Sequence, residues 1–328
     1  MKDRGLEILL VGFGGLGDLL VSLPAISYLR RTMPDRTFTL LCRGEYGNLF
    51  LESREVNRVI SLEGRGGGIL FGASADQDPE TRRWMSGIDV IAGWMRKPLD
   101  PATRSAIDAG CPGRLQIIVP GPGLAIPLSR FFFDRTRDIF PTRAGRTPEF
   151  DECARLRVSD QARAEARTVI GPANTGRDRY AVVHPGSGGQ AKCWPLSNYL
   201  EIIRRLDADG IPGILVTGEA EEKPTIALRL EKESLPGNWT WARRPTLGCL
   251  SGLLEGSSFY LGNDSGVTHL AAACGSRVLA LFRDEGMPVW KPFGRTRVLS
   301  ASDPADINMD RVWEELKNFF LRSDSSLI

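Results

Sequence analysis

Residues 9–20 read LLVGFGGLGDLL, in which a short apolar run enters a glycine-rich turn and a second apolar run follows. The first run completes a buried strand expected at 7–11, and the second opens an amphipathic helix expected to reach residue 31. Further strands are expected at 37–42 and 56–61. Because strands and helices alternate in this order, the segment predicts a parallel sheet with helices on both faces.

The same alternation restarts after a linker expected at 176–179, which follows Gly171 and Pro172 and has the sequence Gly-Arg-Asp-Arg. Strands are expected at 180–184, 213–217, 259–262 and 278–282, helices at 196–207, 224–232 and 267–273, and a final amphipathic helix at 309–321. The stretch from 63 to about 146 is rich in Gly, Pro and Arg, with short strands expected at 88–92 and 115–119. The pattern predicts an α/β protein with domains at 1–170 and 180–305, followed by a segment at 306–328.

Composition limits the classes of protein that the chain can belong to. A length of 328 residues suggests two domains of about 150 residues each. The formal charge of +2 gives no general attraction to nucleic acid, and we expect no nucleic-acid partner. The six cysteines show neither C-x-x-C spacing nor nearby histidines, which favours reduced thiols, a cytoplasmic location and no zinc site. No apolar run approaches the ~20 residues of a membrane span.

The glycine turn matches a dinucleotide-binding pattern only superficially. Gly12, Gly14 and Gly17 have the spacing G-x-G-x-x-G, but the second strand ends in Arg43 where an acid would hold a ribose. Arg43 would instead suit a 2′-phosphate. Asp18 places a carboxylate where a pyrophosphate would rest, and two unit charges 4 Å apart repel by about 4 kcal/mol at an effective dielectric of 20. The context argues against a phosphate cradle at this turn.

Asp18 itself has two interpretations. An acid in the first turn of a helix complements the helix dipole, which stabilises the helix by roughly 0.3–1 kcal/mol. Alternatively, Asp18 is a general base at the carboxyl end of a parallel strand, where open α/β sheets place their chemistry. The turn alone does not decide between them.

Two loops of the second half suggest an anion site. HPGSGG at 184–189 follows a strand and precedes Lys192, while GNDSG at 262–266 runs directly into an alanine-rich helix. Asp264 or Ser265 would cap that helix, and the first amides of the helix would then face an anion. The chain has only two histidines, and both lie in these loops, His184 at a strand end and His269 one turn into the helix. A loop with an incidental lysine and a merely well-capped helix are the alternatives.

Three segments together resemble glycosyltransferase family 9, the bacterial ADP-heptose:lipopolysaccharide heptosyltransferases and their relatives. They are GLGDLLVSLPAISYLRR at 15–31, HPGSGGQAKCWP at 184–195 and GNDSGVTHLAAACG at 262–275. The resemblance covers roughly 7–60 and 180–285. It implies a GT-B fold, in which two Rossmann-like domains with parallel sheets face each other across a cleft. The acceptor would bind the first domain and the nucleotide sugar the second, and the segment at 306–328 would cross back to the first domain.

The resemblance also implies roles for single residues in an inverting sugar transfer that uses no bound metal or other cofactor. Asp18 matches the catalytic base, and Lys192 matches the lysine that holds the donor diphosphate. The expected donor-binding residues are Ser187, Lys192, Glu222, Asp264, Ser265, Gly266 and His269, with Glu219 or Glu221 as alternatives to Glu222 at the donor ribose.

Some features leave other functions open. Relatives often carry a lysine and a Ser/Thr pair just before the Gly-Asp step, where this chain has Gly12, Gly14 and Gly15. An NADP-dependent oxidoreductase that uses the first turn and a sugar-nucleotide-binding protein without catalysis are the alternatives. The expected partners are a nucleotide-sugar donor and a glycan or glycolipid acceptor. Phe131–Phe133 among several arginines suggest peripheral contact with the inner membrane surface, or else a buried aromatic element with solvated arginines around it.

Overall fold

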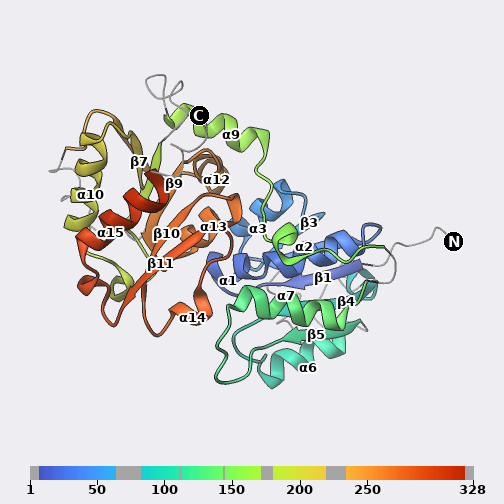
Figure 1. The fold of residues 1–328 in the computed structure, drawn as a ribbon. Helices are drawn as coiled ribbons and strands as arrows, with labels where there is room; N and C mark the ends of the chain where they lie inside the picture. Colours follow the sequence, from blue (N-terminus) through green and yellow to red (C-terminus); the bar gives the residue numbers. More distant parts are fainter. Residues whose placement is uncertain are drawn as a thin grey trace. The chain divides into compact units, whose positions relative to one another are not determined.

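The computed structural model describes residues 7–63, 83–110, 113–142, 145–170, 180–218 and 234–321 (Figure 1). The chain divides into two compact units, Met1–Arg157 and Val158–Ile328. Each unit has its own parallel sheet and its own apolar core. The expected α/β architecture with two parallel sheets is therefore confirmed.

The first unit is built on a five-stranded sheet with the order β3-β2-β1-β4-β5. Its strands are β1 Glu7–Val11, β2 Thr37–Cys42, β3 Arg58–Ser61, β4 Ile88–Trp94 and β5 Arg114–Ile118, and all neighbouring pairs are parallel. Its helices are α1 Leu16–Val21, α2 Leu23–Thr32, α3 Gly44–Glu52, α6 Pro101–Gly110, α7 Leu128–Ile139 and α8 Phe150–Cys153. β1 lies at the centre, so its apolar residues are buried between β2 and β4.

The helix expected after the glycine turn is two helices. Ser22 ends α1 and begins α2, and Pro24 follows at the start of α2, where its missing N–H costs no hydrogen bond. Residues 23–29 of α2 are all buried, and the helix packs against α7 and α8. The short α1 consequently holds the end of the glycine turn as a separate element.

The second unit is built on a six-stranded sheet with the order β11-β10-β9-β6-β7-β8. Its strands are β6 Ala181–His184, β7 Gly213–Thr217, β8 Trp239–Arg243, β9 Phe259–Asn263, β10 Val278–Arg283 and β11 Thr296–Ala301. Its helices are α9 Asp160–Ile170, α10 Leu196–Ala208, α12 Leu247–Glu255, α13 Gly266–Cys274, α14 Met287–Trp290 and α15 Met309–Glu315, which continues as a π-helical segment, Leu316–Leu321. The two edge strands, β8 and β11, were not predicted. The helix expected at 224–232 lies outside the described residues.

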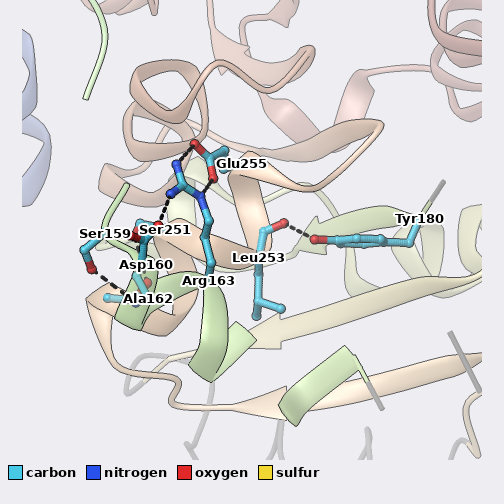
Figure 2. Close-up of polar contacts among 9 residues, drawn as sticks. Ser159, Asp160, Ala162, Arg163, Tyr180, Ser251, Leu253 and Glu255 are labelled. Atoms are coloured by element: carbon cyan, nitrogen blue, oxygen red, sulfur yellow. Dashed lines mark hydrogen bonds and ion pairs between the residues drawn. The ribbon is translucent and has the colours of Figure 1, made fainter. Parts of the chain in front are cut away.

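Helix α9 belongs to the second unit, although the first domain was expected to run to residue 170. Its Arg163 forms a two-pronged ion pair with Glu255 of α12, at 2.7 Å from Nε to Oε2 and 2.9 Å from Nη2 to Oε1 (Figure 2). Beside this pair, α12 presents Gly252, where an added Cβ would come within 2.4 Å of the Ala162 carbonyl oxygen. The glycine therefore permits a close contact between the two helices that the hydrophobic pattern of α9 does not reveal.

The last helix contributes to the core of the second unit. Val312 and Leu316 are fully buried in that core, and the Trp194 indole donates to the Ile307 carbonyl just before the helix, at 2.9 Å. Trp313 packs partly buried against the same cluster. The side chains of Phe319 and Phe320 are outside the described residues, so the crossing of this segment to the first domain stays a prediction.

The aromatic run of α7 faces the interior of the first unit. Phe132 and Phe133 are buried, and Phe133 contacts the rings of Tyr28 and Phe150 edge-on. The arginines around this run pair with acids: Arg130 and Arg137 with Asp134, Arg135 with Asp138, and Arg146 with Glu152. This arrangement favours the buried aromatic element over a basic membrane-facing patch. Among the described residues, no helix has the length and apolar character needed to cross a membrane.

Candidate functional site

The turn between β1 and α1 presents Asp18 at the carboxyl edge of the first sheet. The amide of Gly12 donates to the Leu41 carbonyl at 2.9 Å, which extends the β1–β2 pairing to the start of the turn. Asp18 lies in the first turn of α1, and its Oδ2 accepts from the Gly15 amide at 2.9 Å. This contact satisfies one of the free amides at the helix start, so Asp18 does serve as a helix-terminal acid.

Gly14 allows this orientation of Asp18. A Cβ at Gly14 would lie 2.4 Å from Asp18 Cβ and 2.5 Å from both Cγ and Oδ2. Rotation about the Asp18 side chain cannot relieve the contact with Cβ, so any larger residue at Gly14 requires a backbone shift. The glycine that seemed to fit a dinucleotide fingerprint thus makes room for a carboxylate.

Asp18 also lines a pocket, as the general-base interpretation requires. The pocket has a volume of about 480 Å³ and lies between the glycine turn and the segment that joins β4 to α6. It is lined by Phe13, Gly14, Asp18, Trp94, Met95, Arg96, Lys97, Pro98, Leu99, Asp100 and Thr103. Arg96 Nε lies 3.1 Å from Asp18 Oδ1, and the exposed fractions of the two side chains are 63% and 28%. The pocket therefore combines an apolar lining with accessible charges of both signs.

Sequence reasoning missed Arg96. Its only signal is a basic pair, Arg96-Lys97, directly after an expected strand. The pair becomes informative only once β4 is known to lie beside β1, because the carboxyl ends of both strands then meet at one edge.

In the second unit, the two predicted loops come together because their strands are neighbours. β6 pairs with β9 in parallel, with His184 opposite Gly262, so both strands end at the same edge. Lys192 Nζ lies 2.6 Å from Asp264 Oδ2, and Ser187 Oγ donates to the Asp264 carbonyl at 2.6 Å. The structure thus brings Ser187, Lys192 and Asp264 into one cluster.

Asn263 holds this cluster in place, a role that sequence reasoning did not assign. Its side chain is fully buried, accepts from the Trp194 amide at 3.0 Å and from the Tyr199 hydroxyl at 2.7 Å, and donates to the Pro185 carbonyl at 2.7 Å. Burial raises the pKa of Tyr199 well above its ordinary value, so the hydroxyl remains a donor. Asn263 therefore ties both loops to α10.

The start of α13 completes the cluster. Ser265 caps the helix by accepting from the Thr268 amide at 3.3 Å, and Gly266 is the first helical residue. Lys192 is 47% exposed while the Asp264 side chain beneath it is 11% exposed, so the cation faces solvent. Of its three N–H donors, one points to Asp264, which leaves the ammonium able to donate to an incoming anion. A lysine held at a helix N-terminus is suited to phosphate oxygens.

The two histidines are buried inside the second unit, and the acid expected at the donor ribose lies outside the described residues. His269 is 1% exposed inside α13, with its ring 6.1 Å from that of Trp290, and its contact with the donor stays a prediction. His184 is also buried at the end of β6. Glu219, Glu221 and Glu222 lie outside the described residues. In the described part of the chain, no three His, Cys, Asp or Glu side chains gather closely enough to hold a metal ion.

The comparison with protein families decides the class. The sequence model of glycosyltransferase family 9 (heptosyltransferase) matches residues 127–312, more than half of the chain. The chain belongs to glycosyltransferase family 9. The match includes both loops of the second unit, and the resemblance drawn from three motifs is thereby confirmed. The protein is a glycosyltransferase, and family membership argues against an NADP-dependent oxidoreductase and a non-catalytic binder.

Individual relatives are distant but span the chain. Lipopolysaccharide heptosyltransferase 3 of Escherichia coli K12 is 22% identical over 297 residues, which cover 84% of this chain and 82% of that protein. A family 9 glycosyltransferase from Veillonella parvula superposes with a TM-score of 0.77 at 15% identity, covering 98% of this chain and 99% of that one. E. coli heptosyltransferase WaaC with ADP gives 0.71 at 16% identity, covering 95% and 99%. These superpositions confirm the GT-B fold of the family 9 protein.

Proposed function

We propose that this family 9 glycosyltransferase transfers a heptose, with inversion, from an ADP-linked donor to the lipopolysaccharide core or a related glycan. The observation that carries the proposal is the ion pair of Lys192 with Asp264 at the N-terminus of α13, which leaves a cation facing solvent beside helix amides. A diphosphate fits this arrangement. The names of the relatives, a lipopolysaccharide heptosyltransferase and a heptosyltransferase with bound ADP, support the choice of sugar, nucleotide and acceptor.

The reaction in this proposal is a single displacement. An acceptor hydroxyl oxygen attacks the anomeric carbon from the face opposite the nucleotide, and the bond from that carbon to the β-phosphate oxygen breaks with its electron pair. Asp18 takes the hydroxyl proton as the new bond forms. The departing diphosphate gains negative charge, which Lys192 and the amides of Ser265 and Gly266 stabilise. One carboxylate is enough, because a diphosphate leaves without a general acid.

The described cysteines favour a cytoplasmic setting for this enzyme. Cys42, Cys153, Cys193, Cys249 and Cys274 are all free thiols, as reduced compartments allow. An acceptor that carries a lipid would additionally require contact with the inner membrane surface, and the paired arginines of α7 do not favour that helix as the contact.

The deciding experiment compares Asp18→Asn with Asp100→Asn, which changes another carboxylate of the same pocket. Asparagine at position 18 can still accept from the Gly15 amide but cannot take a proton, so ADP release should fall by roughly 10²–10⁴-fold. The free energy of unfolding should change by less than about 1 kcal/mol. The assay uses ADP-heptose with purified lipopolysaccharide core, and with buffer in its place.

Three results would contradict the proposal. Turnover of Asp18→Asn within a few-fold of wild type would remove Asp18 as the base. An equal loss in Asp100→Asn would point to general disturbance of the pocket. ADP release that does not depend on the acceptor would exclude a transferase acting on that glycan.

A further inference from the structure

Both carboxylate oxygens of Asp18, the proposed base, have partners in this structure. Its Oδ2 accepts from the Gly15 amide at 2.9 Å, and its Oδ1 lies 3.1 Å from Arg96 Nε. A proton that moves to Asp18 removes the negative charge that attracts the guanidinium. Proton transfer from an acceptor hydroxyl therefore costs the ion pair between Asp18 and Arg96. This cost is avoided where Arg96 already pairs with another anion.

Arg96 is placed so that it can exchange partners. Its side chain is 63% exposed and leaves the chain two residues after β4 ends, at the rim of the pocket. Lys97 is the next residue, is exposed and lines the same pocket. Two adjacent cations on one short segment make a surface that can hold an oxyanion.

The second carboxylate of the pocket, Asp100, caps a helix. Asp100 precedes α6 and accepts from the Thr103 amide at 3.0 Å and from the Thr103 hydroxyl at 2.5 Å. It therefore caps the helix. Asp18, which lines the same pocket, lies within ion-pair distance of Arg96.

We propose that Arg96 and Lys97 bind an oxyanion group of the acceptor, a phosphate or a carboxylate, and that this binding draws Arg96 away from Asp18. The inference rests on the proposed function for its acceptor, and it makes Arg96 a positioning and specificity residue. An acceptor with the anion at the right distance from its hydroxyl releases the base. An acceptor without one leaves Asp18 paired.

The test is a titration of the ¹⁵N-labelled protein, followed by NMR through the side-chain Nε–Hε signals of arginine. The Arg96 signal is assigned by its loss in Arg96→Lys, and that of Arg104, an exposed arginine on α6 outside the pocket, serves as the control. Inorganic phosphate and acetate are added separately at constant ionic strength. This readout needs neither donor nor turnover, so its outcome is independent of the proposed sugar transfer.

We expect the Arg96 signal to shift saturably with at least one of the two anions, while the Arg104 signal stays in place. The responding anion identifies the group as phosphate or carboxylate. Lys97→Ala should weaken the binding about three-fold, as expected for loss of one exposed charge contact. Asp18→Asn should bind the same anion more tightly than wild type, because the competing carboxylate is gone.

The outcomes that overturn the inference are equally direct. If neither anion moves the Arg96 signal, or if Arg104 responds equally, the pair Arg96-Lys97 is not an anion site. If the anion binds but Asp18→Asn leaves the anion affinity unchanged, Asp18 and the anion do not compete for Arg96. The proposed release of Asp18 from Arg96 is then wrong.

Discussion

At the scale of single residues, Gly14 should matter more to activity than its neighbour Gly15. Alanine at Gly14 would place a Cβ 2.4 Å from Asp18 Cβ, whereas at Gly15 the nearest atom, Asp18 Oδ2, would be 3.8 Å away. Gly14→Ala should therefore cost about 1–3 kcal/mol of unfolding free energy. It should also lower kcat by about 10²-fold, since a displacement of about 1 Å in a reacting group has that effect.

Gly15→Ala is the matched control for this prediction. The backbone at Gly15, with φ −76° and ψ −178°, suits any residue. The variant should therefore lose less than about 1 kcal/mol of unfolding free energy and keep kcat within a few-fold of wild type. Chemical denaturation and steady-state ADP release on both variants provide the comparison. Equal kcat values for the two variants would show that the orientation of Asp18 does not depend on Gly14.

The same turn shows what single residues reveal in a sequence. Asp18 was located from its place after a buried strand, and the structure gives it the helix-terminal contact of one interpretation and the pocket required by the other. Arg96 was not found, because its meaning depends on the strand order that sets β4 beside β1. Asn263 was visible in its motif, but its four contacts come from elements distant in the chain.

At the scale of elements, the packing of α2 against the end of α3 encloses a carboxyl group. Glu55 is 9% exposed and lies 3.5 Å from Ser27 Oγ, which also accepts from Arg31 Nε at 3.3 Å. Burial raises the pKa of Glu55 from 4.5 to about 7, while Arg31 opposes this rise. Between these two pH values the folded protein binds more protons than the unfolded chain, so stability falls as the pH rises.

Glu55→Gln should remove this pH dependence. Relative to wild type, the free energy of unfolding of the variant should increase by about 3 kcal/mol between pH 4.5 and pH 7, and then remain constant. Urea denaturation across this range measures the difference. Glu45→Gln, an exposed change on α3, is the control for loss of a carboxylate from the surface. A flat difference for Glu55→Gln would mean that the pKa of Glu55 is the same in the folded and unfolded states.

Elements with a strong internal pattern were predicted, and those defined by their neighbours were not. The central strands β1, β6, β9 and β10 are nearly all buried and appear in the sequence as apolar runs. The edge strands are only partly buried, with two buried residues in β8 and one in β11, so neither shows a continuous apolar run. The assignment of α9 to the second unit depends on Gly252 and Glu255 of α12, which no local pattern connects to it.

At the scale of the whole molecule, the two parallel sheets follow from the repeated alternation of strands and helices, but the place of nucleotide binding is a separate question. The first sheet carries the glycine turn that resembles a dinucleotide fingerprint, and the second carries Lys192 and Asp264. Both edges are carboxyl ends of parallel strands, where α/β proteins bind ligands. The charges differ: Asp18 lies beside the exposed Arg96 at the first edge, and the exposed Lys192 lies over Asp264 at the second.

Hydrogen exchange with and without ADP should distinguish the two edges. Because the lysine and the start of α13 attract a diphosphate and Asp18 repels one, ADP should protect amides at 185–193 and 263–268 and leave those at 12–18 unchanged. At 100 times its dissociation constant, ADP should stabilise the protected segments by at most about 2.7 kcal/mol.

Lys192→Ala should need more ADP for the same protection, by roughly 10- to 150-fold if the charge-assisted contact contributes about 1.5–3 kcal/mol. Lys317→Ala, which removes a lysine paired with Glu314 beyond the donor loops, should behave as wild type. Protection at 12–18 instead would place the nucleotide on the glycine turn, and would require a new interpretation of Asp18, since a carboxylate beside a diphosphate opposes its binding.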